Sequence, residues 1–212
     1  TWGGVPVSLV TRECSVALPD APSTKPDAFP VAAGPVELPR AWVSPSTLEG
    51  HAKHVEFFPL GTRLNVQRAD MNALGQAVHG SLAADRPELE PAVRRELAAQ
   101  CLERWGQRGA LTPGELVEAS LRLRAWVEQQ WPGAQWRREL AVSLRQADGS
   151  MLRGTADLVL ELPEGFVLVD HKSFPGGLEA AQERAAGFQG QLDAYTQALE
   201  PALGKPRLGA FI

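Results

Sequence analysis

Apolar residues in the first half of the chain recur at the three- and four-residue spacing of amphipathic helices. Residues 71–84 are predicted to form a helix with Asp70 as its N-cap, because a short carboxylate can accept hydrogen bonds from the first unpaired N–H groups. The apolar positions on one face of this helix are Met71, Leu74, Val78 and Leu82. A second helix is predicted over residues 87–105, where Gly106 ends it.

A third predicted helix carries signals at both of its ends. Thr112 is the expected N-cap, Pro113 occupies the first helical position, and Glu115 completes a capping box with Thr112. Pro132 and Gly133 interrupt the apolar pattern, so the helix is expected to end just before them. Three helices are therefore expected before the first strand of the main sheet.

After residue 136 the hydrophobic period changes to two, which is the period of a half-buried strand. Residues 137–146 alternate leucine and valine with polar neighbours, and the sequence ADGS predicts a hairpin turn. Two further apolar runs follow at residues 152–162 and 166–172, joined by the turn sequence PEG. These segments predict a three-stranded antiparallel meander.

Helical spacing returns over residues 178–199, and the sequence closes on the strand-like run RLGAFI at residues 207–212. A strand that follows a helical crossover lies most simply parallel to its predecessor. The predicted fold class is therefore α/β, with a mixed sheet of the antiparallel meander plus one parallel strand, flanked by helices. Because the chain starts without Met and stops inside an apolar run, we expect it to be a fragment of a longer protein.

Residues 1–45 differ from the rest of the chain because they are rich in Pro, Ala and Ser. So many prolines exclude a long helix or a central strand. We interpret this segment as an extended arm or linker, with room for one short strand at VPVSLV. The folded domain is accordingly expected at residues 46–212.

Composition and charge narrow the function mainly by exclusion. The hydrophobic fraction of 44% and the charged fraction of 22% are those of a soluble globular protein. A formal net charge of −4 gives no basic footprint for binding nucleic acid by charge alone, although an enzyme can still hold a phosphate through a metal ion. No apolar run reaches transmembrane length and no signal peptide is visible. Cys14 and Cys101 form no CxxC pair, so we expect two free thiols and no zinc or iron–sulfur site.

Three charged residues interrupt the apolar strands of the predicted meander: Asp157, Asp170 and Lys172. Strand alternation projects Asp170 and Lys172 to one side and the His171 ring to the other, while the His171 carbonyl stays beside the carboxylate. If Asp157 lies across the hairpin from Asp170, two carboxylates and a carbonyl oxygen converge, and this ligand set suits Mg²⁺ or Mn²⁺. The spacing alone is equally compatible with a structural ion pair between Asp170 and Lys172, with Asp157 bonded to a backbone amide.

These residues belong to a longer series of motifs. The sequences GTADLVLE and GFVLVDHKS, preceded by LGQAVH and followed by QLDAY, resemble the RecB-like branch of the PD-(D/E)xK nucleases. The resemblance is strongest to the C-terminal nuclease domain of UvrD-type helicase–nucleases of the RecB and AddA kind, and it extends over about residues 45–212, with WVSPSTLE at its start. The motif residues in this chain are His79; Gly154, Asp157 and Leu158; Asp170 and Lys172; Gln191 and Tyr195.

The resemblance implies a role for each of these side chains. His79 is expected to bind the metal through a ring nitrogen, beside the carboxylates of Asp157 and Asp170 and the backbone carbonyl of His171. Lys172 is expected to be the catalytic lysine. A Tyr or Phe is common in the family at the position of His171, whose ring we expect to face away from the chemistry.

The remaining candidates keep two interpretations each. Gln191 and Tyr195 lie four residues apart on one helix face, where they are expected to support the site or contact the DNA backbone, or else to pack in the core with a hydrogen bond. Glu139 is either a further carboxylate near the metal or an exposed charge at the start of a strand. His51 and His54 are expected to lie on the surface.

Together these features predict an Mg²⁺- or Mn²⁺-dependent deoxyribonuclease that hydrolyses DNA, mainly single-stranded, in double-strand-break processing and recombination, by exo- or endonucleolytic cleavage. The resemblance implies a helicase domain in the same full-length chain, a partner subunit, and a bacterial cytoplasmic location at the nucleoid, without a membrane partner. The alternative is a non-catalytic DNA-binding or scaffold module with the same fold. A hydrolase of small phosphate esters is disfavoured, because the chain has no Gly-rich phosphate loop.

Overall fold

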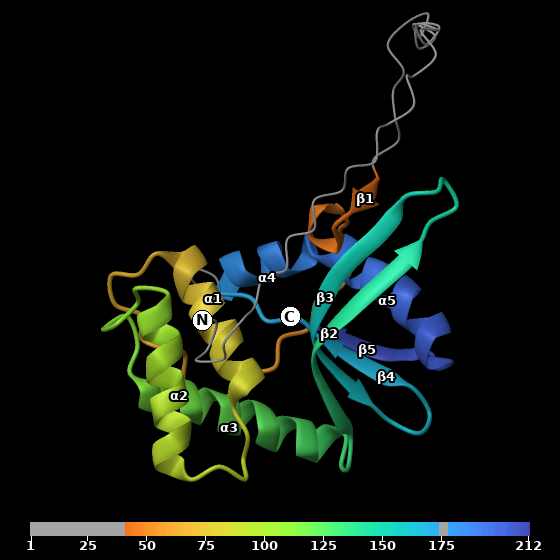
Figure 1. Ribbon diagram of the computed structural model, residues 1–212. Coiled ribbons are helices and arrows are strands. Elements are labelled where there is room, and N and C mark those ends of the chain that lie inside the picture. The colour runs from red at the N-terminus through yellow and green to blue at the C-terminus, as the bar shows by residue number, and fades with distance from the viewer. Residues whose placement is uncertain (1–40, 174–177) are drawn as a thin grey trace, which may run out of the picture. The chain divides into compact units, whose positions relative to one another are not determined.

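The fold is that of a computed structural model, which describes residues 41–173 and 178–212. Its described part is a five-stranded mixed sheet with helices on both faces, so the predicted α/β class is confirmed (Figure 1). The short strand expected at VPVSLV, and Cys14, lie outside the described residues.

The three helices before the sheet are α1 (Met71–Ala84), α2 (Pro91–Arg104) and α3 (Pro113–Gln130). Asp70 accepts hydrogen bonds from two N–H groups of the first turn of α1, and Thr112 and Glu115 form the predicted capping box at the start of α3. The second helix begins at Pro91 and not at residue 87, because this proline takes the first helical position, where no N–H is needed.

The sheet is built on the hairpin of β2 (Gln135–Arg145) and β3 (Met151–Glu161), followed by β4 (Phe166–Val169) antiparallel to β3. The last strand, β5 (Arg207–Phe211), lies parallel to β4 as predicted. The structure adds a short first strand, β1 (Trp42–Val43), parallel to the start of β3, in residues that the sequence assigned to the arm. The third meander strand is shorter than predicted, since β4 ends at Val169.

One edge of β3 is shared by two partners, and this leaves a gap between them. β1 pairs with Met151 and Leu152, whereas β4 pairs only from Leu158 onward. Among the described strands, none pairs with residues 153–157 on this edge, and the other edge is covered by β2. The gap is the place where the chain's charged motif residues meet the sheet.

The helical segment after β4 is two helices and not one. α4 (Leu178–Ala186) and α5 (Gln189–Leu203) are separated by a turn in which Gly187 N–H donates to the Arg184 carbonyl. The break brings the start of α5 against the backbone of residues 48–49, where a Cβ on Gly190 would lie 2.4 Å from the Glu49 carbonyl oxygen. This close approach requires glycine at residue 190 and could not be read from helical periodicity alone.

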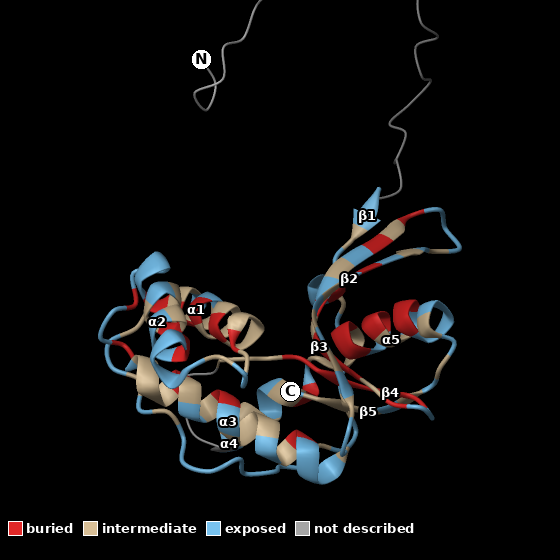
Figure 2. Ribbon diagram, turned by 60° about the horizontal axis from the view of Figure 1, so that its bottom comes forward, coloured by how far each residue is buried: buried red, intermediate tan, exposed pale blue. Residues whose placement is uncertain are grey.

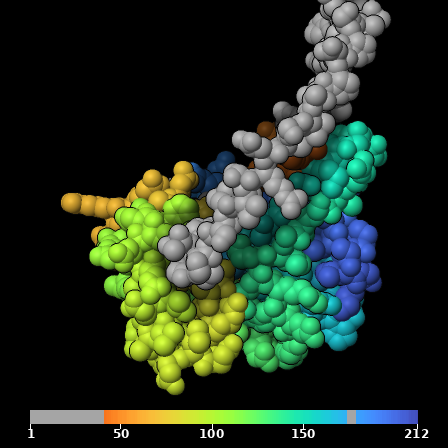
Figure 3. Space-filling view, in the orientation of Figure 1, coloured from red at the N-terminus to blue at the C-terminus, as the bar shows by residue number. Residues whose placement is uncertain are grey.

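Three apolar clusters hold these layers together, and the buried segments of the sheet and of α5 are visible in Figure 2. One cluster joins one sheet face to α5, a second joins the opposite face to α3, and a third fills the space among α1, α2 and α3. In the space-filling view the helical residues and the hairpin residues form two adjoining blocks (Figure 3). The α1–α3 layer thus packs beside the sheet, with α1 next to the stretch of β3 between its β1 and β4 pairings.

Two further expectations concern composition. Among the described residues, no helix is both long enough and apolar enough to cross a membrane. Cys101 is a free thiol, as expected.

Candidate active site

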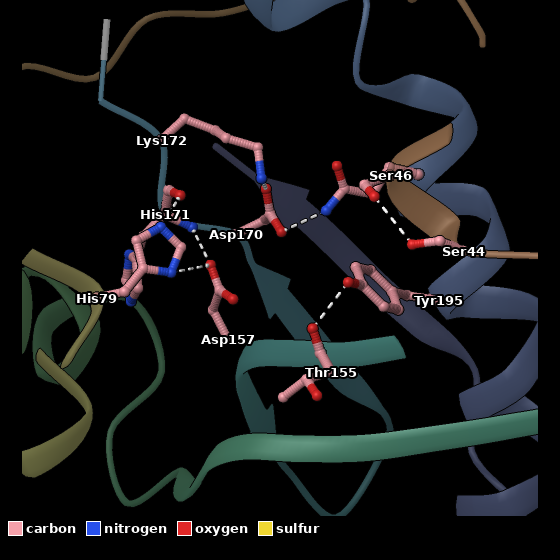
Figure 4. A network of polar contacts seen from close by, with 10 residues as sticks. Ser44, Ser46, His79, Thr155, Asp157, Asp170, His171, Lys172 and Tyr195 are labelled. Carbon is pink, nitrogen blue, oxygen red and sulfur yellow. Dashed lines mark hydrogen bonds and ion pairs between the residues drawn. The ribbon is translucent and has the colours of Figure 1, made fainter. Parts of the chain in front are cut away.

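The centre of the site is the contact between His79, on α1, and Asp157, on β3. His79 Nδ1 lies 3.3 Å from Asp157 Oδ2, and His79 Nε2 lies 2.5 Å from the backbone carbonyl oxygen of His171 (Figure 4). The His171 N–H donates a 2.7 Å hydrogen bond to Asp157 Oδ2. The imidazole of His79 therefore contacts both the carboxylate of Asp157 and the carbonyl oxygen of His171, and the three groups come from three separate segments of the chain.

Glu139 joins this centre from β2. Its carboxylate, one ring nitrogen of His79 and a carboxylate oxygen of Asp157 all lie within 4.8 Å of one another. Within the hairpin, Arg138 pairs with Leu158 and Leu140 pairs with Ala156. Glu139 and Asp157 lie between these two pairs and therefore opposite each other. Of its two interpretations, a position beside the carboxylate of Asp157 fits the structure. The side chain is exposed, as the other interpretation expected, but it lies inside β2 and not at its start.

The backbone of Glu139 is strained. Its φ of 49° lies in the left-handed region, which costs a non-glycine residue about 1–3 kcal/mol and is often found at functional sites. The apolar side chains of both strands change sides at this level: Ala156 packs in the cluster that contains α5, and Leu158 packs in the cluster that contains α3. The regular alternation of the hairpin is thus interrupted at the residue pair that supplies two carboxylates.

Asp170 and Lys172 form a second part of the site just beyond the end of β4. The Lys172 ammonium is ion-paired with Asp170 Oδ2, and Gln191 on α5 donates a 2.8 Å hydrogen bond to Asp170 Oδ1. The Asp170 N–H donates to the carbonyl of Phe211, which keeps this stretch aligned with β5 after β4 has ended. Continuing the β3–β4 register by one pair places Asp157 opposite Asp170.

The two aspartates have opposite pKa shifts. Burial raises the pKa of Asp157, but the hydrogen bond and charge of His79 outweigh burial, so the pKa lies below its usual value. Burial also raises the pKa of Asp170, and there the Lys172 ammonium offsets it only in part. The hydrogen bond that His79 donates to Asp157 in turn raises the pKa of His79, although burial opposes it. Asp157 is therefore the carboxylate that holds its negative charge more firmly.

The His171 ring does not face away from the site, contrary to the expectation. Alternation does put it on the side opposite Asp170, but His79 occupies that side, and the two rings meet edge to face at 5.9 Å between centroids. Burial lowers the pKa of His171 to about 4, so its ring is neutral at pH 7. The ring therefore packs against His79 and helps to fix its orientation.

Tyr195 and Gly154 fit the gap between β1 and β4. Burial raises the pKa of Tyr195 to about 12, so its hydroxyl stays protonated and donates a 2.7 Å hydrogen bond to the Thr155 carbonyl (Figure 4). A Cβ on Gly154 would lie 2.9 Å from Pro45 and 3.2 Å from the Tyr195 ring. Gly154 thus lets both side chains approach β3 next to Asp157. Tyr195 is buried in the core cluster and hydrogen-bonded to Thr155, which fits the expected alternative of core packing with a hydrogen bond.

A positive side chain lies next to the carboxylates. Arg138 lines a small depression together with Glu139, Asp157 and His171, and its guanidinium stacks 4.7 Å from the centre of the Trp136 ring. Burial and the neighbouring arginines lower the pKa of Arg138 to about 10, so it remains charged at pH 7.

The donor set of this site fits a divalent cation. The His79 imidazole lies close to the carboxylates of Glu139 and Asp157 and to the backbone carbonyl of His171. Oxygen-rich ligand sets of this kind suit Mg²⁺ or Mn²⁺. Asp170 Oδ2 is buried, and the Lys172 ammonium contacts it as an ion pair. A buried carboxylate oxygen with spare acceptor capacity is what a nearby cation would use.

The other candidates lie away from this centre. His51 and His54 are exposed, as expected, and His54 lies 3.3 Å from Glu56 at the surface. Glu139 was only a secondary candidate in the sequence, but the hairpin register contains the signal for it. Arg145 and Met151 are the pair next to the turn. The sixth residue before Arg145 is Glu139 and the sixth after Met151 is Asp157, so the two are expected to lie opposite each other.

The comparisons with known proteins agree with this geometry. A family model of the PD-(D/E)XK nuclease superfamily matches residues 43–212. A search of curated proteins found no match to the chain. The matched range contains strands β2 to β5, helices α1 to α5 and every residue of the site described above. The chain belongs to the PD-(D/E)XK nuclease superfamily.

Proposed function

We propose that this domain is a metal-dependent DNA nuclease that hydrolyses phosphodiester bonds, mainly in single-stranded DNA. Membership of the superfamily implies nuclease activity in general. The single observation that carries the proposal is the meeting of His79, Glu139 and Asp157, whose ligand atoms lie within 4.8 Å of one another, next to the Asp170–Lys172 ion pair.

The metal site of the proposal uses groups already in contact. His79, Glu139 and Asp157 would hold the ion together with the His171 carbonyl, and the carboxylate of Asp170 is the further ligand expected from its position opposite Asp157. A bound Mg²⁺ or Mn²⁺ supplies Lewis-acid chemistry, lowering the pKa of water and neutralising phosphate charge.

The protein's own residues supply positioning and charge. Asp170 holds the Lys172 ammonium in place, and Gln191 in turn fixes the carboxylate of Asp170. An ammonium held in this way can orient an attacking water or stabilise the negative charge that develops on the phosphate. The Lys172 side chain is 22% exposed, so substrate can reach it.

The wider setting of the proposal comes from the motif resemblance. The resemblance supports a domain at the C-terminal end of a helicase–nuclease that would act in double-strand-break processing and recombination, with a partner subunit. In that setting the motor domain delivers a single strand to the site. Recognition through phosphates would give little sequence specificity.

Cleavage of labelled single-stranded DNA in Mg²⁺ or Mn²⁺ tests the proposal. We expect Lys172→Ala to reduce the rate by at least about 100-fold, a typical loss when a charge-stabilising or proton-transferring group is removed. Lys53→Ala removes an exposed lysine outside the site and is the matched control, which should cleave like the wild type. Equal rates for all three proteins would refute the role of Lys172. A wild-type protein without metal-dependent cleavage would favour the non-catalytic module instead.

A further inference from the structure

A large groove opens beside the site on its Lys172 side. It has a volume of about 740 Å³ and is lined by residues of the 63–69 segment and of the first two turns of α1, together with Leu111, Lys172 and Ser173. Ligand sites in proteins occupy roughly 300–1,000 Å³, so the groove is large enough for much more than one phosphate. The depression at the carboxylates, which Arg138 lines, is a separate and much smaller feature.

The charged residues among the described lining of the groove are all positive. Arg63, Arg68 and Lys172 line it, and none of the described residues that line it is Asp or Glu. The chain as a whole has a net charge of −4, so a lining with two arginines and a lysine, the lysine being ion-paired with Asp170, runs against its average. Arg68 is exposed and forms no hydrogen bond or ion pair with the described residues. These charges favour an anionic ligand.

The floor of the groove is apolar. Leu64 and Val66 from the incoming segment, and Met71 and Val78 from α1, pack on the cluster among α1, α2 and α3 and are only partly buried. The backbone of the incoming segment is fixed by a 2.9 Å hydrogen bond from Gln67 N–H to the Ala110 carbonyl. Apolar side chains on a fixed backbone offer a surface to flat, uncharged ring faces.

A cationic rim over an apolar floor matches the two chemical faces of a single nucleic-acid strand. Phosphates bind cations, and the faces of unpaired bases bind apolar or aromatic surfaces. A duplex presents only its phosphates in this way, because its base faces are stacked inside. Lys172, which is ion-paired with Asp170, is one of the residues that line the groove, so a strand lying in the groove would contact a residue of the candidate site.

We infer that this groove binds the part of a single-stranded nucleic acid adjacent to the scissile phosphate. Its phosphates lie against Arg68 and Arg63, and its bases lie over Leu64, Val66 and Met71. This assignment rests on the proposed nuclease function, because that function puts the scissile phosphate next to Lys172. It adds a substrate-binding surface that lies outside the metal ligands and their supporting residues.

The test reverses the charge of Arg68, whose exposed side chain forms no hydrogen bond or ion pair with the described residues. Arg68→Glu and the milder Arg68→Gln are compared with Arg145→Glu, a control at an exposed arginine next to the turn between β2 and β3. Fluorescence anisotropy with a labelled 20-nucleotide single strand, in EDTA and at several salt concentrations, measures binding. We expect Arg68→Glu to raise Kd about tenfold and reduce the salt slope by about one, while Arg145→Glu changes neither.

Cleavage kinetics separate this inference from the proposed function. With Mn²⁺, Arg68→Glu should raise KM and leave kcat near the wild-type value. If the wild type cleaves DNA but Arg68→Glu binds and cleaves like it, the groove assignment is overturned and the nuclease stands. If the wild type does not cleave but Arg68→Glu still weakens strand binding, the groove stands and the nuclease proposal falls. Equal loss of affinity for single strands and blunt duplexes would overturn the single-strand assignment.

Discussion

The side chain of Asp85 joins three helices, and its removal gives the sharpest stability prediction. Asp85 accepts two hydrogen bonds of 2.6 Å from Arg94 on α2 and a third of 2.6 Å from Ser120 on α3. Only 5% of Asp85 and 7% of Arg94 are exposed. Asp85 is the C-cap of α1, the helix that carries His79, so the ion pair with Arg94 also holds α1 in its position beside the candidate site.

The expected effect of Asp85→Ala follows from what it leaves behind. Arg94 would keep its positive charge in a buried position without a partner, and breaking a buried pair in this way costs about 3–5 kcal/mol of unfolding free energy. In a domain of this size that loss corresponds to a fall in Tm of roughly 6–20 °C. Replacing Arg94 by Met in the same protein removes the stranded charge, and we expect it to restore more than about 1 kcal/mol.

Urea unfolding followed by tryptophan fluorescence measures these changes, since the chain has six tryptophans. Glu118→Ala is the control, because this side chain is 70% exposed and lies 3.8 Å from Arg122. An exposed pair of this kind contributes less than about 0.5 kcal/mol. A loss below about 1 kcal/mol for Asp85→Ala, or no recovery in the double variant with Arg94→Met, would refute the reasoning.

Three other predictions concern the same domain. Gly154→Ala should lower the unfolding free energy by about 1–3 kcal/mol in urea titrations, because its Cβ would lie 2.9 Å from Pro45; an unchanged midpoint would contradict the close packing. Tyr195→Phe leaves the carbonyl of Thr155 without its hydroxyl donor and should cost about 1–3 kcal/mol, with cleavage retained in the folded protein; loss of cleavage at full stability would instead indicate a chemical role. The hydrogen bonds to Asp85 hold its pKa below the unfolded value of about 3.9 despite burial, so its contribution to the unfolding free energy is complete above that pH and is lost as the pH falls through the folded pKa. Asp85→Asn should therefore flatten the acidic part of a curve of unfolding free energy against pH, and an unaltered curve there would contradict this.

The sequence predicted the parts of the fold that depend on neighbours along the chain. The caps at Asp70 and Thr112, the change of period at the start of β2 and the hairpin turn before β3 are all local signals, and the structure has each of them. Helix starts are local as well, but Pro91 was read as an interior residue although a proline fits only the first turn.

The features that sequence analysis missed depend on distant contacts. The break between α4 and α5 accompanies the approach of Glu49 to Gly190, more than a hundred residues along the chain. The position of the His171 ring depends on α1, which strand alternation does not include. Glu139 is a different case, because counting outward from the predicted turn would have placed it opposite Asp157.

The proposed metal centre requires that the group around Asp157 binds a divalent cation. Isothermal titration of Mn²⁺ into the wild type, Asp157→Asn and the control Asp148→Asn measures it directly, since Asp148 is an exposed carboxylate in the hairpin turn. We predict that the wild type and the control bind Mn²⁺ alike, and that Asp157→Asn binds it more than about tenfold more weakly. Equal Mn²⁺ affinity in all three proteins would contradict the assignment of this site as a metal centre.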